Sequence, residues 1–347
     1  MSALSAKIGT KLAASVVFAF GADGAEKLVG DVAAKPDAFQ EDASPLVRQI
    51  AEAVVSGPYI ERVPEALPKP QPSAMRFAGK FAVVTGASKG IGAGIAVRLA
   101  QEGAHVCIHY GRDEEGAKRT QAAIVALGID ESKTMIVGAN MGDEAAIRAM
   151  FATYFATWSR LDILIPNAGV QYPNASHEAP VAEFDKVIAI NLRGYLICAQ
   201  IALAHFIARG DAAPEEPRSG AGTIVFCSSV HQIVPKPTYL GYACSKAAIG
   251  HMTRTLALEY AGRSIRVNAV APGAVATPMN MAWIDDPVKR AGVCEHIPQG
   301  RPGSSEEIAA TFAFLASDDA SYITGQTLFA CGGLSLYPEF RDAWASE

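Results

Sequence analysis

The chain has 347 residues, of which half are hydrophobic and 19% are charged, so it is long enough for one large domain with an additional segment. This composition, with 31 Gly and 20 Pro, excludes collagen, coiled-coil and disordered chains. Lys and Arg total 30 against 35 Asp and Glu, and the net charge of −5 without a basic run argues against a nucleic-acid partner. We expect a small-molecule partner and other copies of the chain instead.

The six cysteines are widely spaced and include no C-x-x-C pair, so the sequence predicts neither a zinc site nor a disulfide scaffold and fits a reducing, cytoplasmic setting. No run reaches the roughly 18 apolar residues of a membrane span, so no membrane partner is expected. Near the start, Lys7 and Lys11 precede an apolar stretch over residues 12–20. This stretch has the shape of a weak signal peptide, but a short buried helix is the simpler explanation.

The first 75 residues are predicted to form a small, mostly helical extension. Two helices are expected within residues 1–57, and the second covers residues 44–55, where Ser44 can cap the helix and Pro45 occupies its first position. Five prolines between Pro58 and Pro72 then favour an extended connector that cannot continue a helix. We place the boundary near residue 75, with an extension over residues 1–75 and a domain over residues 76–347.

Beyond the connector, short β-branched runs alternate with helical patterns, which predicts right-handed crossovers and a parallel sheet with helices on both faces. Most runs are continuously apolar, as expected of strands buried on both sides. The predicted strands cover residues 81–85, 106–110, 134–137, 163–165, 223–227, 265–269 and 327–330. The expected fold class is therefore α/β, a doubly wound, Rossmann-type sheet of seven parallel strands.

A glycine-rich loop with Gly86, Gly90 and Gly92 follows the first strand and precedes a helix predicted over residues 93–101. This arrangement is typical of dinucleotide binding, because glycines let the backbone approach the pyrophosphate and the helix N-terminus presents free N–H groups. The same loop matches G-x-S-x-G around Ser88, the nucleophile elbow of α/β-hydrolases. In the α/β-hydrolase fold several strands precede the nucleophile, whereas here the loop follows the first strand, so dinucleotide binding is favoured over the hydrolase interpretation. It is also favoured over a purely structural glycine turn that binds no ligand.

The end of the second strand indicates the cofactor. Enzymes that prefer NAD carry an acidic residue there to bind the ribose hydroxyls, whereas this chain has Tyr110. Arg112 follows two residues later, and Lys89 lies in the glycine loop. These two cations favour the 2′-phosphate of NADP(H), with NAD(H) as the alternative if both are merely solvated.

The second strand also carries His105, Cys107 and His109 at period two, which places them on one face and resembles a set of metal ligands. No fourth ligand is spaced nearby, so no metal site is predicted. His109 is expected to lie beside the adenosine pocket.

Tyr242 and Lys246 are spaced i and i+4 and would project from one face of a helix. Ser229 precedes Tyr242 by thirteen positions at the end of a strand, and Asn191 lies in a helix predicted over residues 184–200. Together with the T-G-x-x-x-G-x-G loop and the segment Pro166-Asn-Ala-Gly169, this order and spacing resembles the short-chain dehydrogenase/reductase family.

The resemblance implies an NAD(P)-dependent oxidoreductase acting on CH–OH groups. Tyr242 would be the general acid/base; a free tyrosine has a pKa of about 10, so Lys246 and the oxidised nicotinamide are needed to favour its phenolate. Lys246 would also hold the nicotinamide ribose. Ser229 would bind the substrate oxygen, and Asn191 would position a water that relays the proton.

The resemblance also implies where the cofactor binds. Downstream, Pro272-Gly-Ala-Val-Ala-Thr277 is similar to the family's P-G-x-x-x-T, whose backbone and threonine hydroxyl meet the nicotinamide amide. A stretch over residues 278–300, with Met279, Met281 and Trp283, is expected to form a substrate lid or to pack on a neighbour. The expected cofactor-binding residues are Gly86, Ser88, Lys89, Gly90, Ile91, Gly92, Tyr110, Arg112, Asn140, Asn167, Ala168, Gly169, Tyr242, Lys246, Pro272, Gly273, Val275 and Thr277.

Residues 76–340 resemble the family throughout, and residues 228–237 and 320–340 are similar to bacterial glucose 1-dehydrogenases. This implies an NADP-dependent sugar or polyol oxidoreductase that forms a homotetramer or homodimer. A reductase of aldehydes, ketones or 3-oxoacyl thioesters and a non-catalytic cofactor-binding protein are the alternatives. The chain departs from the family pattern at Pro166, Asn140 and Cys331, and Gln171 stands where glucose enzymes tend to carry an acid.

Overall fold

A computed structural model of the protein describes residues 24–32, 50, 71, 75–213 and 221–336. Two compact units are distinguished: the larger comprises Lys69–Met279 and Gly303–Cys331, and the other includes Asn280–Pro302. Residues 24–32 are helical. The signal-like stretch, the helix predicted over residues 44–55 apart from Ile50, and the connector apart from Gln71 lie outside the described residues, so the boundary at residue 75 stays a prediction.

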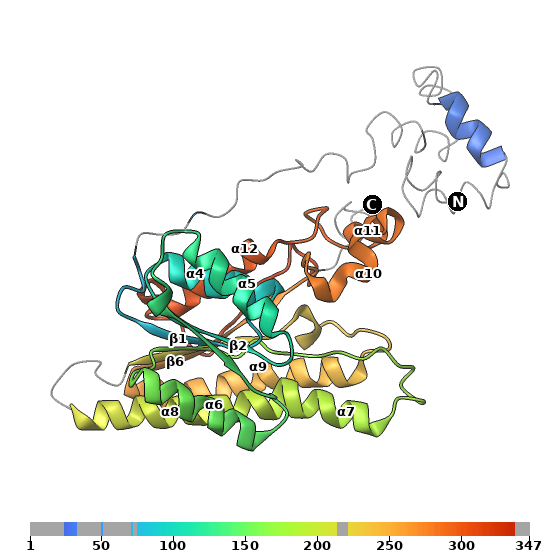
Figure 1. The fold of residues 1–347 in the computed structure, drawn as a ribbon. Coiled ribbons are helices and arrows are strands. Elements are labelled where there is room, and N and C mark those ends of the chain that lie inside the picture. Colours follow the sequence, from blue (N-terminus) through green and yellow to red (C-terminus); the bar gives the residue numbers. More distant parts are fainter. Residues whose placement is uncertain (1–23, 33–49, 51–70, 72–74, 214–220, 337–347) are drawn as a thin grey trace. The chain divides into compact units, whose positions relative to one another are not determined.

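The larger unit is built on a sheet of seven parallel strands (Figure 1). Their spatial order is β3-β2-β1-β4-β5-β6-β7, so the direction of winding reverses between β1 and β4. All seven predicted strands and the doubly wound fold are confirmed, and only β6 is markedly longer than expected. The strands are β1 (Phe81–Val84), β2 (His105–Tyr110), β3 (Thr134–Gly138), β4 (Ile163–Ile165), β5 (Gly222–Cys227), β6 (Ile265–Pro272) and β7 (Thr327–Ala330).

Helices cover both faces of the sheet (Figure 1). One face carries α4 (Gly90–Gln101), α5 (Glu114–Val125) and α12 (Ser305–Ala316), and the other carries α6 (Glu144–Thr157), α7 (Val181–Ile188), α8 (Gly194–Ala212) and α9 (Leu240–Tyr260). Several begin at side chains that cap free backbone N–H groups, such as Asp113 before α5 and Asp143 before α6. The smaller unit contains α10 (Met281–Ile284) and α11 (Pro287–Glu295).

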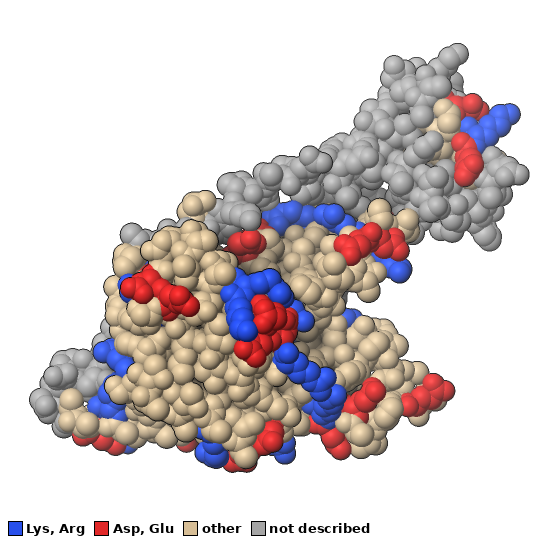
Figure 2. All heavy atoms as spheres, viewed as in Figure 1, with Lys and Arg blue, Asp and Glu red and all other residues tan. Residues whose placement is uncertain are grey.

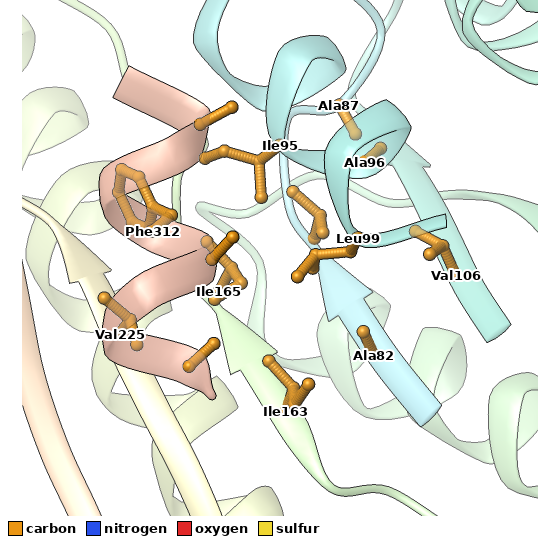
Figure 3. Packing of buried hydrophobic residues seen from close by; sticks show 14 of the residues in the cluster. Ala82, Ala87, Ile95, Ala96, Leu99, Val106, Ile163, Ile165, Val225 and Phe312 are labelled. Atoms are coloured by element: carbon orange, nitrogen blue, oxygen red, sulfur yellow. The ribbon is translucent and has the colours of Figure 1, made fainter. Parts of the chain in front are cut away.

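The core on the α4 and α12 face shows why these segments adopt this fold. Ile95 and Leu99 of α4 lie one turn apart on the same side of the helix and pack with Phe312 of α12 against the strands (Figure 3). All three side chains have no exposed surface. Burying one such side chain contributes roughly 1.5–3 kcal/mol, so this layer holds the first strand and the loop after it in place.

The helix predicted over residues 184–200 is interrupted. It begins at Val181, passes through a π-helical segment at Ala189–Arg193 and continues to Ala212. Such π segments are frequent at functional sites, and this one contains Asn191. Among the described residues, Val181–Ala212 is the one helix long and apolar enough to cross a membrane, yet half of its apolar window is buried in the protein, as in a core helix.

Charged side chains are mixed on the face drawn in Figure 2. Lys and Arg alternate with Asp and Glu there, among wide areas of other residues, and they do not gather into one basic area.

Candidate active site

The predicted site residues of the larger unit lie at the carboxyl ends of the parallel strands. The glycine loop follows β1, Arg112 follows β2, Asn140 follows β3, and Asn167 follows β4. Ser229, predicted to lie at the end of a strand, stands two residues beyond Cys227, where both the predicted strand and β5 end. In open α/β sheets, ligands bind at this edge where the winding reverses, here between β1 and β4.

The glycine loop has a tight backbone conformation that only glycine allows at two of its positions. Gly86 has a φ of 67°, in the left-handed region that favours glycine. A Cβ at Gly92 would lie 2.2 Å from the Gly86 carbonyl oxygen, so no larger residue fits there. Helix α4 begins at Gly90, earlier than predicted, and no described side chain caps its first turn. Its N–H groups can therefore bind an anion.

Thr85 joins this loop to the segment after β4. Its hydroxyl accepts hydrogen bonds from the backbone N–H groups of Asn167 at 2.8 Å and Ala168 at 3.0 Å. The Asn167 amide in turn donates to the carbonyls of Thr85 at 2.9 Å and Gly86 at 3.2 Å. The predicted Asn167-Ala-Gly169 segment thus supports the glycine loop. The sequence signal for Thr85 was its place in T-G-x-x-x-G-x-G.

His109 holds the other side of the loop. Its Nδ1 accepts from the Gly86 N–H at 3.0 Å, so Nε2 carries the proton and donates to the Ala139 carbonyl at 3.0 Å. The ring has no exposed surface, and burial lowers its pKa to about 4. Both ring nitrogens are thus used within the fold, and the described residues contain no group of three or more His, Cys, Asp or Glu arranged for a metal.

The residues predicted to bind the adenosine part of the cofactor lie in the glycine loop and after β2 and β3. Arg112 is exposed and forms no ion pair within the described part of the chain. Lys89 lies 3.7 Å from a carboxylate oxygen of Asp113, which also caps α5. Sequence reasoning did not include Asp113, although an acid at a helix start is a readable signal. The Asn140 side chain accepts from the Gly142 N–H at 3.0 Å and stabilises a turn.

Ser229 and Tyr242 are brought together, as predicted. Ser229 is buried, and its hydroxyl lies close enough to the Tyr242 phenol to lower the pKa of Tyr242 in part; burial is the larger effect and raises that pKa to about 12. Ser229 also caps the short helix Val230–Gln232 by accepting from the His231 N–H at 3.2 Å. The His231 ring lies 6.2 Å from the Tyr242 ring, centre to centre. Sequence reasoning missed His231 as a neighbour of the site.

Lys246 lies one turn after Tyr242 on α9, with its ammonium 5.6 Å from the centre of the Tyr242 ring. The ammonium donates to the Cys227 carbonyl, and burial lowers its pKa. Desolvation favours the uncharged form of both side chains, so the cofactor-free protein keeps Tyr242 as the neutral phenol.

Asn191 lies on the π-helical segment and is fully buried. Its side-chain amide accepts from the Val170 N–H and donates to the Val170 carbonyl, both at 2.9 Å, and approaches the Ser245 hydroxyl at 3.3 Å. The amide therefore fastens the loop after β4 to α9. The predicted water-positioning role stays a prediction.

The loop after β6 also reaches the glycine loop. A Cβ at Gly90 would lie 3.3 Å from the Thr277 Cβ, so the two predicted cofactor segments are in contact. Val275 forms an isolated bridge with Gly303, and the Gly273 N–H donates to the Ala330 carbonyl at 3.1 Å. This loop is thus fixed from both sides. Met281 and Trp283 of the predicted lid lie in α10, within the smaller unit, and their role stays a prediction.

Comparison with known proteins agrees with this geometry. A family model described as enoyl-(acyl carrier protein) reductase matches residues 86–335. A glucose 1-dehydrogenase of Gluconobacter oxydans is 44% identical over 277 residues, which cover 80% of this chain and 100% of that protein. A gluconate 5-dehydrogenase from Burkholderia cenocepacia, solved with NADP and tartrate, is 30% identical with a TM-score of 0.68, over 76% of this chain and 98% of that one. A 3-ketoacyl-(acyl-carrier-protein) reductase from Brucella melitensis, solved with NADH, is 31% identical with a TM-score of 0.66, over 75% of this chain and 100% of that one.

Proposed function

Because the chain belongs to the short-chain dehydrogenase/reductase family, as an oxidoreductase acting on CH–OH groups, we propose that it transfers hydride between NADP(H) and a sugar or polyol. The observation that carries this proposal is the placement of Ser229 beside the Tyr242 phenol, with Lys246 one turn after Tyr242 on α9. The similarity to a glucose 1-dehydrogenase supports the substrate class.

The residues present fit a nicotinamide cofactor, since the glycine loop leaves no room for a Cβ at Gly92 and the first turn of α4 has free N–H groups. When bound, the cofactor accepts or supplies the hydride at the substrate carbon. Ser229 donates a hydrogen bond to the substrate oxygen. Tyr242 takes the hydroxyl proton during oxidation and returns it during reduction, and Lys246 stabilises the phenolate and holds the ribose.

For the cofactor, we propose a preference for NADP(H) over NAD(H). Arg112 carries a charge that no described carboxylate pairs with, at the edge where the adenosine phosphate would bind. Lys89 supplies a second charge, shared with Asp113 at 3.7 Å. Guanidinium groups bind phosphate through charge-assisted hydrogen bonds, so Arg112 is the main determinant.

A carbonyl reductase is the second candidate. The raised pKa of Tyr242 keeps the phenol protonated, which suits a general acid that donates to a carbonyl oxygen. The similarity to a 3-ketoacyl-(acyl-carrier-protein) reductase also supports activity in the direction of carbonyl reduction.

One spectrophotometric experiment separates these proposals. The protein is assayed with glucose and polyols plus NADP⁺ or NAD⁺, and with aldehydes, ketones and 3-oxoacyl thioesters plus NADPH or NADH. Turnover on the first panel supports the sugar or polyol proposal, and turnover on the second alone supports the reductase. Tyr242→Phe should abolish turnover on either panel while cofactor binding is retained, and activity surviving in that variant would contradict the mechanism.

We further propose that the protein is cytoplasmic and assembles as a homotetramer or homodimer, and that residues 1–75 form an extension outside the catalytic domain. Light scattering of the full chain and of a variant lacking residues 1–75, each assayed for activity, tests both the assembly and the boundary.

A further inference from the structure

The loop between Ser229 and Tyr242 contains a half-buried lysine, Lys236, that has no acidic partner among the described residues. Its Nζ lies 3.7 Å from the centre of the Tyr239 ring, and it forms no ion pair with any residue that the structure describes. Burial lowers its pKa, and no carboxylate counteracts that shift. An ammonium group held on a ring in this way is ready to pair with an anion.

Lys236 lies just before the N-terminal end of α9, and the Tyr242 phenol is carried by the first turn of the same helix. Tyr239 is the residue from which α9 starts, three positions before Tyr242, and its carbonyl accepts from the Ala243 N–H at 2.9 Å. The pKa of His231 is lowered mainly by burial, and the nearby charge of Lys236 lowers it further. The His231 ring lies beside the Tyr242 ring. Lys236 therefore acts electrostatically on the immediate surroundings of Tyr242.

The backbone that carries Lys236 is strained. Thr238 has a φ of 68°, a left-handed conformation that is unusual for a β-branched residue. Its carbonyl is held by the Asn174 N–H at 2.8 Å, and Tyr239 N–H returns to the Lys236 carbonyl at 3.4 Å. The turn folds Lys236 back over Tyr239. Strain of this kind is concentrated at binding sites and switches, so it points to a functional position.

A second lysine repeats the arrangement on the neighbouring segment. Lys186 lies with its Nζ 5.2 Å from the centre of the Tyr172 ring, and it too forms no ion pair in the described part of the chain. Tyr172 stands two residues before Asn174, which binds Thr238, so the two aromatic-lysine pairs belong to joined segments. Gln171, the residue before Tyr172, is neutral.

We infer that Lys236 and Tyr239 form a subsite for an anionic group of the substrate, a carboxylate or a phosphate monoester carried away from the reacting carbon. This inference rests on the proposed oxidoreductase function and narrows its substrate class from neutral polyols to hydroxy acids or phosphorylated sugars. The positive charge of Lys186 adds long-range electrostatic attraction for the same anionic group.

The test compares three probes of similar size: glucitol, which is neutral, gluconate, which carries a carboxylate, and glucose 6-phosphate. For the wild-type protein we expect kcat/KM for one anionic probe to exceed that for glucitol by at least about tenfold, and Lys236→Gln to reduce this ratio about tenfold to a hundredfold. Lys236→Arg should keep most of the ratio. Lys133→Gln, at the amino end of β3, removes the same charge from the opposite edge of the sheet and is the matched control.

Equal kcat/KM for neutral and anionic probes in the wild type, or an equal fall for both in Lys236→Gln, would overturn the inference while leaving the proposed function intact. If no probe is turned over, the panel of sugars, polyols and carbonyl compounds described above decides the proposed function, and titration calorimetry of gluconate and glucose 6-phosphate into the protein with NADP⁺ decides the subsite separately. A Kd that rises at least tenfold in Lys236→Gln supports it, and an unchanged or undetectable affinity contradicts it. The two anions distinguish a carboxylate from a phosphate ligand.

Discussion

The Lys246 ammonium donates a 2.7 Å hydrogen bond to the backbone carbonyl of Cys227. Cys227 ends β5, and Ser229, the proposed partner of the substrate oxygen, follows two residues later. The lysine therefore fastens α9, which carries Tyr242, to the strand that carries Ser229. This contact gives Lys246 a structural role besides any effect on the Tyr242 phenol.

Lys246→Met removes this bond and leaves the Cys227 carbonyl buried with only a 3.4 Å contact to the Tyr195 hydroxyl. Losing one hydrogen bond to a charged donor costs about 1.5–3 kcal/mol of folding free energy. We expect kcat to fall at least a hundredfold, because the phenolate also loses its neighbouring cation. Urea unfolding and steady-state kinetics measure the two effects. If Lys246→Met showed the expected loss of folding free energy but an unchanged kcat, Lys246 would have only the structural role.

The raised pKa of Tyr242 predicts opposite pH dependences for the two directions. Oxidation needs the phenolate, so log kcat/KM should rise by about one per pH unit below the apparent pKa. Reduction needs the phenol, so its rate should be flat and then fall above that pKa. The cofactor-free value of about 12 should drop when oxidised cofactor binds, because the positive ring favours phenolate. Rates of oxidation and of reduction measured from pH 6 to 10 test this. Slopes of log kcat/KM against pH that have the same sign for both reactions would contradict it.

Arg112→Gln should raise the KM for NADP⁺ about tenfold and change that for NAD⁺ less than about twofold, because only the former carries the 2′-phosphate. Arg148→Gln on α6 removes an arginine that pairs with Glu144 and is the control for a general loss of charge. An unchanged KM for NADP⁺ in the Arg112 variant, or a wild-type preference for NAD⁺, would overturn the cofactor assignment.

The strands and motifs were predictable because each depends on local sequence. Continuous apolar runs and the glycine spacing mark β1 and the loop after it, and the i, i+4 pair of Tyr242 and Lys246 follows from helix geometry alone. The unpredicted features depend on contacts across the sheet. Only the fold shows that the Lys246 ammonium meets a carbonyl of β5, or that His109 reaches the glycine loop from β2.

His109→Leu tests whether the imidazole positions the glycine loop. The variant leaves the Gly86 N–H and the Ala139 carbonyl without their 3.0 Å partners. We expect the KM for the cofactor to rise about tenfold with kcat within about threefold, since in the proposed function the loop binds the cofactor pyrophosphate and not the substrate. His105→Leu changes the other histidine of β2, which stacks on Phe81, and should leave the cofactor KM unchanged. Equal effects of the two substitutions would indicate a merely structural role for His109.

Burial of His109 also predicts an acid-dependent loss of stability. Its pKa is about 4 in the folded protein and about 6.5 when exposed, so the unfolded chain takes up the proton first as the pH falls. The contribution of His109 to the free energy of unfolding is fully present above about pH 6.5 and is lost progressively as the pH falls toward 4. At pH 5 about 2 kcal/mol of it has been lost. His105, His205 and His231 also have lowered pKa values and contribute with the same sign. The free energy of unfolding in urea, measured at pH 7.5 and 5 for the wild type and for His109→Gln, isolates the His109 share. The variant should lose about 2 kcal/mol less than the wild type between the two pH values, and equal losses would show that this imidazole is not held neutral by its burial.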